Sequence, residues 1–329
     1  MSQDPETKPP QTSTPARRVT ARDVANAAGV SIALVSYAFN RPGRVAPATR
    51  ERILQTATAL GYTGPDPAAR ALRLGRHGTI AFRGEGTVED LVGDPAAALV
   101  VRGLAKACDR SGRSLVLGGE AAPSAAADGT ILWRASAPPD AVGQTVTIDA
   151  LGPSPRSSGA IDVGADLGGG VASVCRHLRE QGHERLAILS WPGAGIRLSA
   201  AVQHWAPNPF QVYEMPAADR GHGEVAARTA LAEEERPTAV LGLSDELALG
   251  ALDAARRIEL DVPRKLSICG VDDLPAAGAA DLTSVFVPYH PMGDLAGAIL
   301  VDLIAGEKPP APQLLPTSLT IRATTARAR

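Results

Sequence analysis

The side chains whose types and spacing suggest a chemical role are concentrated in residues 19–40. The spacing predicts two short helices joined by a tight turn, and the outer face of the second helix carries apolar and hydroxyl groups. These are Ile32, Ala33, Ser36 and Tyr37. A helix-turn-helix of this kind places its second helix in the major groove of DNA, where such side chains contact phosphates and base edges. The chemistry indicated is therefore non-covalent recognition of nucleic acid.

Neighbouring residues determine how this outer face is positioned. Thr20 can cap the first helix, and Asp23 stands at the return position of a capping box. Gly29 can form the turn because glycine adopts a left-handed conformation without a Cβ penalty, and Ser31 is a suitable N-cap for the second helix. The inward faces are predicted to be Val24, Ala25, Ala28, Leu34, Val35 and Ala38. An ordinary helical hairpin needs the same pattern and remains an alternative at this point.

Charge distinguishes this segment from the rest of the chain. Residues 17–77 contain ten arginines, no lysine and three acidic residues, a net charge of +7, whereas the whole chain carries −2. A basic N-terminal module on an acidic body is typical of nucleic-acid-binding proteins. Residues 47–60 add a third predicted helix, with Pro47 in its first turn and Gly61 at its end. Three helices suffice for a small core, and the combination favours a DNA-binding module.

Several short motifs in residues 19–72 resemble those of one family. They include Val19-Thr20-x-x-Asp23-Val24-Ala25, Ala28-Gly29-Val30-Ser31, Thr49-Arg50-Glu51-Arg52-Ile53, Leu60-Gly61-Tyr62 and Ala69-Arg70-Ala71-Leu72. Their order and spacing are similar to those of the DNA-binding domain of the lactose-repressor (LacI/GalR) family of bacterial transcription regulators. The resemblance implies that a homodimer binds double-stranded operator DNA of pseudo-palindromic sequence.

The resemblance also implies residue roles. Hydroxyl and amide groups that would position the module on phosphates are Ser31, Ser36, Asn40 and Thr49. The base-reading positions hold Ile32, Ala33 and Tyr37, and Tyr37 stands where an arginine is common in the family. Direct base readout is therefore expected to be sparse, because these side chains lack the bidentate donors of arginine. The complete predicted DNA-binding set is Thr20, Arg22, Ser31, Ile32, Ala33, Ser36, Tyr37, Asn40, Arg44, Thr49, Ala69 and Leu72.

The segment that follows the three helices resembles the hinge of the family. The predicted organisation is a disordered tail at residues 1–18, the helix-turn-helix domain at 19–63 and a hinge helix or linker at 64–77. By resemblance, the hinge helix folds on the operator and Leu72 is the apolar wedge in the minor groove, with Ala69 beside it. A proline-punctuated linker is the alternative reading of this segment.

From residue 78 onward, short apolar segments alternate with amphipathic helical segments. The predicted strands are 79–82, 114–117, 129–133, 145–148, 186–189, 211–213, 239–242 and 266–271. The predicted helices are 95–111, 166–181, 224–233, 245–258 and 292–305. This alternation favours parallel α/β sheets with ligand sites at the carboxyl ends of the strands.

Motifs in the second half extend the family resemblance. They include Gly182-His183-x-Arg185, Ser244-Asp245-x-x-Ala248-Leu249-Gly250 and Gly270-Val271-Asp272-Asp273. They are similar to the two-lobed, periplasmic-binding-protein-like domain of the family. The expected fold class is α/β, an all-α helix-turn-helix domain followed by two lobes of doubly wound parallel sheets. The effector-binding and dimerisation domain is placed at 78–329, with lobe 1 at about 78–159 and 289–313 and lobe 2 at about 160–288 and 314–329.

The resemblance places four effector-binding candidates in the cleft between the lobes. They are Arg197, Ser244, Asp245 and Asp272. A guanidinium and a carboxylate are suited to polyol or anion recognition, so the expected effector is a sugar or related metabolite. Asp245 could instead cap the helix that it begins, and Arg197 could form a surface ion pair. The first lobe departs from the family, since residues 118–129 are too short for the usual helix, and a weakened or lost effector response is a further possibility.

Other function classes have little support in the sequence. Catalytic motifs such as Gly-x-Ser-x-Gly, the P-loop and His-Glu-x-x-His are absent, and no cofactor or metal is expected. Three separated cysteines and the lack of a long apolar run or signal peptide favour a cytoplasmic protein without membrane contact. The predicted function is a DNA-binding transcriptional regulator that is expected to act as a repressor and not as an enzyme. The alternative is a nucleotide-dependent α/β enzyme with an N-terminal interaction module, which lacks a complete Gly-x-Gly-x-x-Gly fingerprint here.

Overall fold

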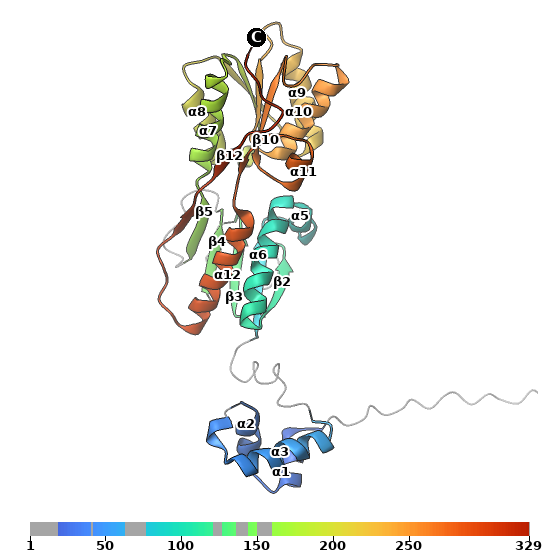
Figure 1. Cartoon of the computed structure of the whole chain (residues 1–329), viewed down its shortest axis with the longest axis vertical. Helices are drawn as coiled ribbons and strands as arrows, with labels where there is room; N and C mark the ends of the chain where they lie inside the picture. The colour runs from blue at the N-terminus through green and yellow to red at the C-terminus, as the bar shows by residue number, and fades with distance from the viewer. Residues whose placement is uncertain are drawn as a thin grey trace, which may run out of the picture. The chain divides into compact units, whose positions relative to one another are not determined.

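A computed structural model describes residues 19–40, 42–62, 77–120, 127–135, 144–149 and 160–328, apart from the side chains of Asn40 and Pro42. The chain falls into two units, residues 1–77 and 78–329 (Figure 1). The predicted tail at 1–18 and most of the predicted hinge, including Ala69 and Leu72, lie outside the described residues.

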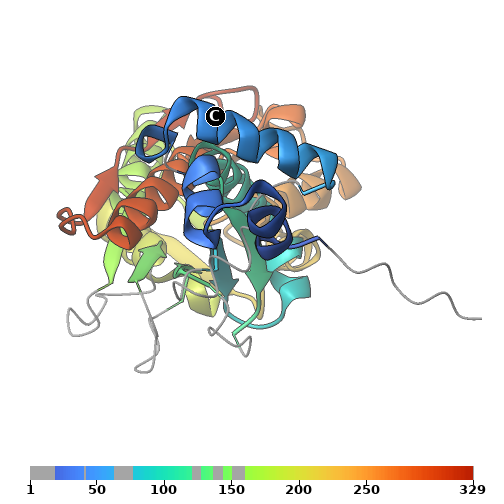
Figure 2. The ribbon, with the colours of Figure 1, turned by 90° about the horizontal axis from the view of Figure 1, so that it is seen from below.

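The described residues of the N-terminal unit form three α-helices, which are drawn in blue in Figures 1 and 2. They are α1 (Ala21–Ala28), α2 (Ile32–Asn40) and α3 (Pro47–Ala59), with a short 3-10 turn at Pro42–Arg44. The expected capping box is present, because the Thr20 amide donates to the Asp23 carboxylate at 2.9 Å and the Asp23 amide donates to the Thr20 hydroxyl at 3.4 Å. Gly29 has a φ of 64°, the left-handed conformation that ends α1 and permits the turn.

The core of this unit matches the predicted inward faces. Val24, Ala25, Val35 and Ala38 are buried, and Ile53 from α3 joins them. Phe39 and Tyr62 close one side of the core as an edge-to-face pair with ring centroids 5.8 Å apart. Burial of one apolar stripe from each helix holds α2 in place and leaves its opposite face to solvent.

The second unit consists of two lobes, each with a six-stranded sheet. The strands of the first lobe are β1 (Thr79–Gly84), β2 (Ser114–Gly118), β3 (Gly129–Trp133), β4 (Gln144–Ile148), β5 (Ile161–Ala165) and β11 (Gln313–Leu315). They lie in the order β11-β5-β4-β3-β1-β2, and the described neighbours are all parallel. The helices of this lobe are α5 (Val88–Gly93), α6 (Pro95–Ser111) and α12 (Tyr289–Ala305).

The second lobe repeats this architecture. Its strands are β6 (Leu186–Ser190), β7 (Phe210–Glu214), β8 (Ala239–Gly242), β9 (Ser267–Asp272), β10 (Thr283–Phe286) and β12 (Ser318–Thr320). The order is β12-β10-β9-β8-β6-β7, with only β12 antiparallel to its neighbour among the described pairs. Its helices are α7 (Leu167–Glu180), α8 (Gly195–Trp205), α9 (Arg220–Leu231), α10 (Asp245–Arg257) and α11 (Pro275–Ala279). Figure 1 shows α7 and α8 on one side of this sheet and α9 and α10 on the other.

The chain passes between the lobes after β5, after β10 and after β11. Lobe 1 therefore includes residues 161–165 and extends to Leu315, whereas the sequence placed the changes of lobe near residues 160 and 314. Apart from this shift of a few residues, the predicted fold class is confirmed.

The helix that begins at the second crossing is packed unusually close to its neighbour. A Cβ at Gly103 on α6 would lie 2.2 Å from the His290 carbonyl oxygen of α12, and a Cβ at Gly293 would lie 2.2 Å from the Val100 carbonyl oxygen. Only glycine permits this approach of the two backbones. The contact fixes the first turn of α12, where Tyr289 lies.

Candidate DNA interface and inter-lobe site

The outer face of α2 presents the predicted base-reading residues in two different ways. Ile32 is 45% exposed and Ala33 is also exposed, at the N-terminal end of the helix. Tyr37 is half-buried and packs against the core of the three helices, so its ring supports the module and only part of it faces solvent. The Ser31 hydroxyl accepts from the Leu34 amide at 3.2 Å and so caps the same end of α2. The Ser31 cap and the core of the three helices therefore fix the N-terminal end of α2, the end that is available to a DNA groove.

The other predicted DNA contacts surround this helix. Arg22 and Arg44 are exposed, Ser36 and Thr49 are half-buried, and the Thr20 hydroxyl donates to the Asp23 carboxylate at 2.7 Å. The Asn40 side chain, Ala69 and Leu72 lie outside the described residues.

A contact that the sequence did not reveal holds the end of α2. The Arg50 guanidinium of α3 donates through Nε to the Ala38 carbonyl oxygen at 3.2 Å. Its role is therefore to orient α2, and a motif match alone could not separate it from a DNA contact.

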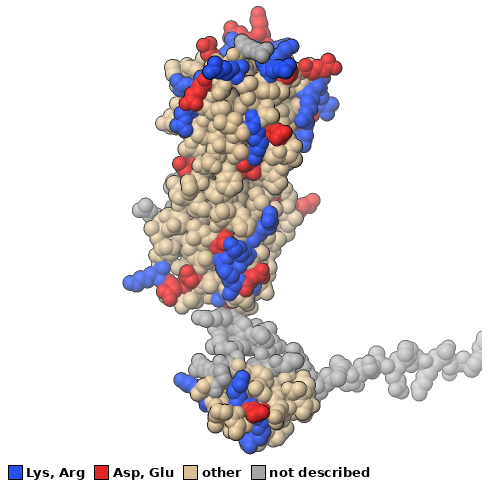
Figure 3. All heavy atoms as spheres, viewed as in Figure 1, with Lys and Arg blue, Asp and Glu red and all other residues tan. Residues whose placement is uncertain are grey.

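The described surface of this unit is basic. Its charged side chains are Arg22, Asp23, Arg44, Arg50, Glu51 and Arg52. On the face visible in Figure 3, blue arginine groups outnumber red acidic groups. A positive surface attracts the phosphate backbone irrespective of base sequence.

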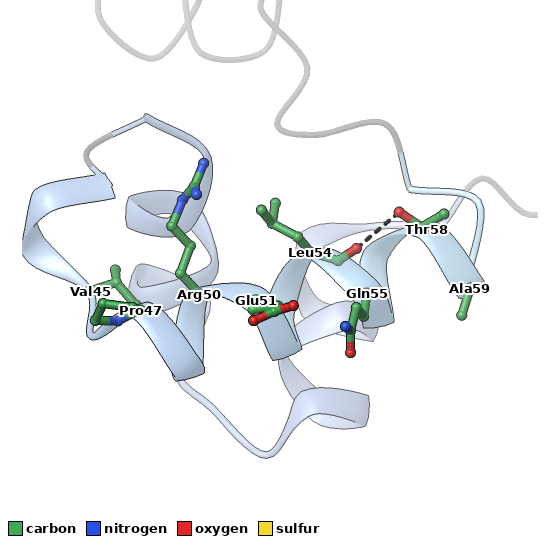
Figure 4. A pocket seen from close by; sticks show the side chains of 8 residues that line it. All are labelled: Val45, Pro47, Arg50, Glu51, Leu54, Gln55, Thr58 and Ala59. Carbon is green, nitrogen blue, oxygen red and sulfur yellow. Dashed lines mark hydrogen bonds between the residues drawn. The ribbon is translucent and has the colours of Figure 1, made fainter.

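A groove also runs along α3 in this unit. Figure 4 shows that its lining side chains project from successive turns of one helix, with Val45 just before it. The Thr58 hydroxyl donates to the Leu54 carbonyl oxygen of its own helix at 3.0 Å. Because the lining does not converge from several elements, this groove is a helix surface rather than a small-molecule site.

The second candidate site lies where both sheets of the other unit end. Arg197 projects from α8 and Asp272 ends β9, and both side chains are about 95% buried, with 4% and 5% exposed. An Arg197 Nη atom donates to Asp272 Oδ1 at 2.8 Å, and its other Nη atom donates to the Leu243 carbonyl oxygen at 2.7 Å. The structure therefore brings together two of the four predicted effector residues in a buried ion pair. A surface pairing of Arg197 is excluded by its burial.

The sequence did not identify Tyr289, which joins this pair. Its hydroxyl donates to Asp272 Oδ1 at 2.5 Å and accepts from Arg197 at 2.9 Å. Burial and the neighbouring Asp272 carboxylate raise the pKa of Tyr289 well above its usual value, so the hydroxyl remains protonated. Its position just after an inter-lobe crossing is the one feature of the sequence that could have indicated a site residue. A tyrosine by itself does not indicate an effector site.

Arg134 is the contribution of the first lobe. It follows β3 and donates to the Tyr289 hydroxyl at 3.1 Å, to Asp149 at 3.3 Å and to Asp94 at 3.4 Å. Its guanidinium lies 4.4 Å from the centre of the Trp133 ring, a cation–π contact. The sequence did not indicate Arg134, because the family motifs are weakest in this lobe.

The backbone is strained where these side chains leave the strands. Arg134, Asp149 and Asp272 have φ values of 50°, 54° and 126°, which residues with a Cβ rarely adopt. All three lie at the carboxyl ends of parallel strands. Such strain concentrates at functional sites, where surrounding contacts hold it in place.

The remaining two effector candidates have structural contacts. Ser244 caps α10 by accepting from the Leu247 amide at 3.3 Å, so the cap is Ser244 and not Asp245. Asp245 is fully buried and accepts from the Leu274 amide at 2.7 Å and the Ser284 hydroxyl at 2.5 Å. Burial, reinforced by the Asp272 carboxylate, raises the pKa of Asp245 to about 7. These bonds tie α10 to the loop before α11 and to β10.

The described residues contain no group of three or more histidine, cysteine, aspartate or glutamate side chains placed to hold a metal ion. Among the same residues, no helix is both long and apolar enough to cross a membrane.

Comparison with known proteins agrees with this architecture. The family model described as bacterial regulatory proteins, lacI family, matches residues 20–64, and the periplasmic binding protein-like domain matches residues 175–325. The chain is 29% identical over 329 aligned residues to an HTH-type transcriptional regulator of Mycobacterium tuberculosis, an alignment that covers 88% of this chain and 92% of that protein. It is also 29% identical over 315 aligned residues to the ribose operon repressor of Escherichia coli, with coverage of 87% and 93%.

A solved structure shares the fold. It is the crystal structure of the lac repressor dimer bound to operator and the anti-inducer ONPF, with a TM-score of 0.80, 23% identity and coverage of 94% of this chain and 100% of that chain. The two family models lie in the same order as the two structural units, one in each. The chain therefore belongs to the LacI/GalR family and is a DNA-binding transcriptional regulator.

Proposed function

We propose that this chain is a repressor that binds a pseudo-palindromic operator as a homodimer and is controlled by a small molecule at the inter-lobe site. The observation that carries the proposal is the capped N-terminal end of α2, with Ile32 and Ala33 exposed on a basic three-helix unit. Related proteins that are named repressors, and a lac repressor structure described as an operator-bound dimer, support this assignment.

DNA contact is assigned to the predicted set that surrounds α2. Ser31, Ser36 and Thr49 supply hydroxyls for phosphates, and Arg22 and Arg44 supply exposed charge. Ile32 and Ala33 offer apolar contact to thymine methyl groups. The hinge role of Ala69 and Leu72, with Leu72 as a minor-groove wedge, remains part of the proposal.

Dimerisation is assigned to the first lobe. Strand β2 is the last strand of the described sheet, and its Val116 is 51% exposed. Val88 and Val92, one helical turn apart on α5, are 44% and 62% exposed. Apolar side chains left in solvent at a sheet edge and a nearby helix favour burial against a second copy. We expect Val116→Asp to shift the chain toward monomer in sedimentation velocity, whereas Ile321→Asp, at an exposed residue of the C-terminal segment, leaves it unchanged.

Effector control is assigned to the site formed by Arg197, Asp272 and Tyr289. A guanidinium and a carboxylate together match the donors and acceptors of a polyhydroxyl compound. A ligand that binds one arrangement of the lobes more tightly shifts the population of DNA-competent molecules. The name of the related ribose operon repressor supports a sugar as the ligand class.

The operator part of the proposal is tested by selection from sheared genomic DNA followed by footprinting. We expect enriched fragments with two protected half-sites, about 10 base pairs apart or a multiple of that, in inverted orientation. Protection of unrelated sequences without enrichment contradicts sequence-specific repression.

A further inference from the structure

One buried hydroxyl group joins the two lobes of the second unit. The Tyr289 hydroxyl takes part in three hydrogen bonds, donating to Asp272 at 2.5 Å and accepting from Arg197 at 2.9 Å and from Arg134 at 3.1 Å. Arg197 and Asp272 belong to lobe 2, whereas Arg134 follows β3 of lobe 1. Tyr289 opens α12, whose first turn is fixed against α6 of lobe 1. We call these four residues the tyrosine junction.

The tyrosine junction is sealed by aromatic groups. The Trp133 ring packs edge-on to Tyr289 with centroids 5.7 Å apart, and the Trp133 Nε1 donates to Asp94 at 2.9 Å. The ring centre of Trp191, the residue after β6, lies 5.8 Å from the Arg197 guanidinium. Tyr289 is 1% exposed. Its hydroxyl therefore occupies hydrogen-bonding positions on Arg197 and Asp272 that a ligand of these two residues would need.

The polar groups at this site satisfy one another. The Tyr289 hydroxyl accepts a hydrogen bond from Arg197 and donates one to Asp272. One hydroxyl group of a polyol could make the same two bonds with this pair. Leaving a buried arginine or aspartate without a partner is costly, so removing the hydroxyl from these partners requires a replacement for it.

We infer that Tyr289 is a built-in occupant of the effector site, whose hydroxyl holds the two lobes together. This inference rests on the proposed function, because it treats the inter-lobe site as the place of effector control. A small molecule gains access only by displacing the Tyr289 hydroxyl from Arg197 and Asp272. Its apparent affinity is reduced by the fraction of molecules in which the junction is intact. The junction thus sets the concentration at which any effector begins to bind.

Tryptophan fluorescence reports on this junction directly. The chain has three tryptophans, Trp133 and Trp191 beside the junction and Trp205 buried in α8. We would measure acrylamide quenching of the full chain and its variants, with circular dichroism to verify that each is folded. In Tyr289→Phe the ring remains but the three hydrogen bonds are lost. The quenching constant should rise by about two-fold, because the lobes open more often and expose Trp133 and Trp191.

Two further variants make the test specific. Arg134→Met removes the lobe 1 group that holds the Tyr289 hydroxyl in position. The bonds of that hydroxyl to Arg197 and Asp272 should weaken, so quenching should rise, by less than in Tyr289→Phe. This variant keeps the inference testable if Tyr289→Phe fails to fold. Tyr213→Phe is the matched control, since the Tyr213 hydroxyl donates to Glu233 at 2.7 Å within lobe 2. It should leave quenching unchanged. Quenching in folded Tyr289→Phe or Arg134→Met that equals the wild-type value would overturn the inference.

The quenching experiment and the DNA-binding proposal can fail independently of each other. Quenching is measured without DNA, so an unchanged value would remove the built-in occupant and leave repression by operator binding in place. Loss of all DNA binding in the wild-type chain would instead remove the repressor proposal and leave the measured contact between the lobes in place.

Discussion

Tyr37 illustrates how one residue can serve both the fold and recognition. It lies at a position that the family resemblance assigns to base reading, yet its ring packs against the core of the three helices. A tyrosine offers one hydroxyl and an apolar ring in place of the bidentate donors of an arginine. Sequence preference at this position is therefore expected to be modest, with affinity coming largely from phosphate contacts.

We predict that Tyr37→Ala relaxes sequence preference more than it weakens non-specific binding. The expected loss is about 1 kcal/mol on the selected operator, the lower end of what a bidentate contact contributes, and less on random DNA. Fluorescence anisotropy with both DNAs measures the two values. Equal losses on both DNAs would refute a base-reading role and leave Tyr37 as a packing residue.

Asp272 carries a larger energetic role than its predicted ligand contact implied. It neutralises Arg197 in a site where both side chains are buried. We predict that Asp272→Ala lowers the free energy of unfolding by about 3–5 kcal/mol, because it leaves a buried guanidinium without its counter-charge. Urea denaturation measures the change. Asp253→Ala is the control, since its partner Arg220 is 50% exposed and such a pair contributes about 0–1 kcal/mol.

At the scale of elements, most strands and helices were predictable from their period. The helix at 95–111 and the strand at 129–133 have the bounds that the sequence predicted. Both have apolar residues at a regular spacing between clear end signals. The predicted strand at 145–148 and helix at 245–258 differ from the structure by one residue at one end.

The elements that the sequence did not predict are short or lack a regular apolar pattern. Strand β5 contains Asp162 and Gly164 within five residues, and β12 has only three residues. Helix α8 begins after a Pro-Gly turn without a side-chain cap. These elements form because neighbouring strands and helices cover them, which local sequence does not record. The sequence predicted Arg197 as an effector residue but did not predict the helix α8 that carries it. The burial of Arg197 was therefore not predicted either.

The close packing of α6 on α12 should make the stability of the chain sensitive to an added side chain at the contact. Gly103→Ala should lower the free energy of unfolding by about 1–3 kcal/mol, because its Cβ would collide with the backbone of α12 and force the helices apart. Thermal denaturation measures the effect. Gly93→Ala, where an added Cβ meets nothing within 4 Å, should change stability far less. Equal changes in the two variants would show that the contact does not constrain the helices.

At the scale of the whole molecule, buried histidines link stability to pH. His183 bonds to Thr238 at 3.0 Å and to Ser267 at 2.9 Å, and His177 bonds to Thr325 at 3.0 Å. Burial lowers the pKa of both imidazoles in the folded chain. The unfolded chain then binds more protons below its ordinary pKa of about 6.5. The stability that these groups provide is present above that pH and is lost as the pH falls toward their folded pKa.

We predict that lowering the pH from about 7.5 to about 5.5 removes the stability that the two imidazoles provide, which urea denaturation of the wild-type chain and of a His183 variant measures as a difference. Asp245 acts in the opposite sense, because its pKa is raised to about 7 and its contribution is lost as pH rises through that value. His183→Asn separates the two effects and should flatten the decline at low pH. An unchanged pH slope in that variant would contradict the assignment to His183.

The fold class followed from the sequence, whereas the inter-lobe site did so only in part. Arg197 and Asp272 were found through family motifs, but Tyr289 and Arg134 were not. Tyr289 lies just after the crossing from β10 to α12, and Arg134 lies in the lobe with the weakest motifs. Contacts between residues 155 positions apart depend on the tertiary fold and leave no local pattern.

We propose that this family member recognises a particular DNA sequence through α2. The most direct test is the binding of the full chain to a genomically selected fragment and to a scrambled fragment of the same length, at two salt concentrations. We predict at least about 1,000-fold tighter binding to the selected fragment, with both affinities falling as salt rises because phosphate contacts release counterions. Equal affinity for the two fragments, or no binding to either at low salt, would contradict the claim.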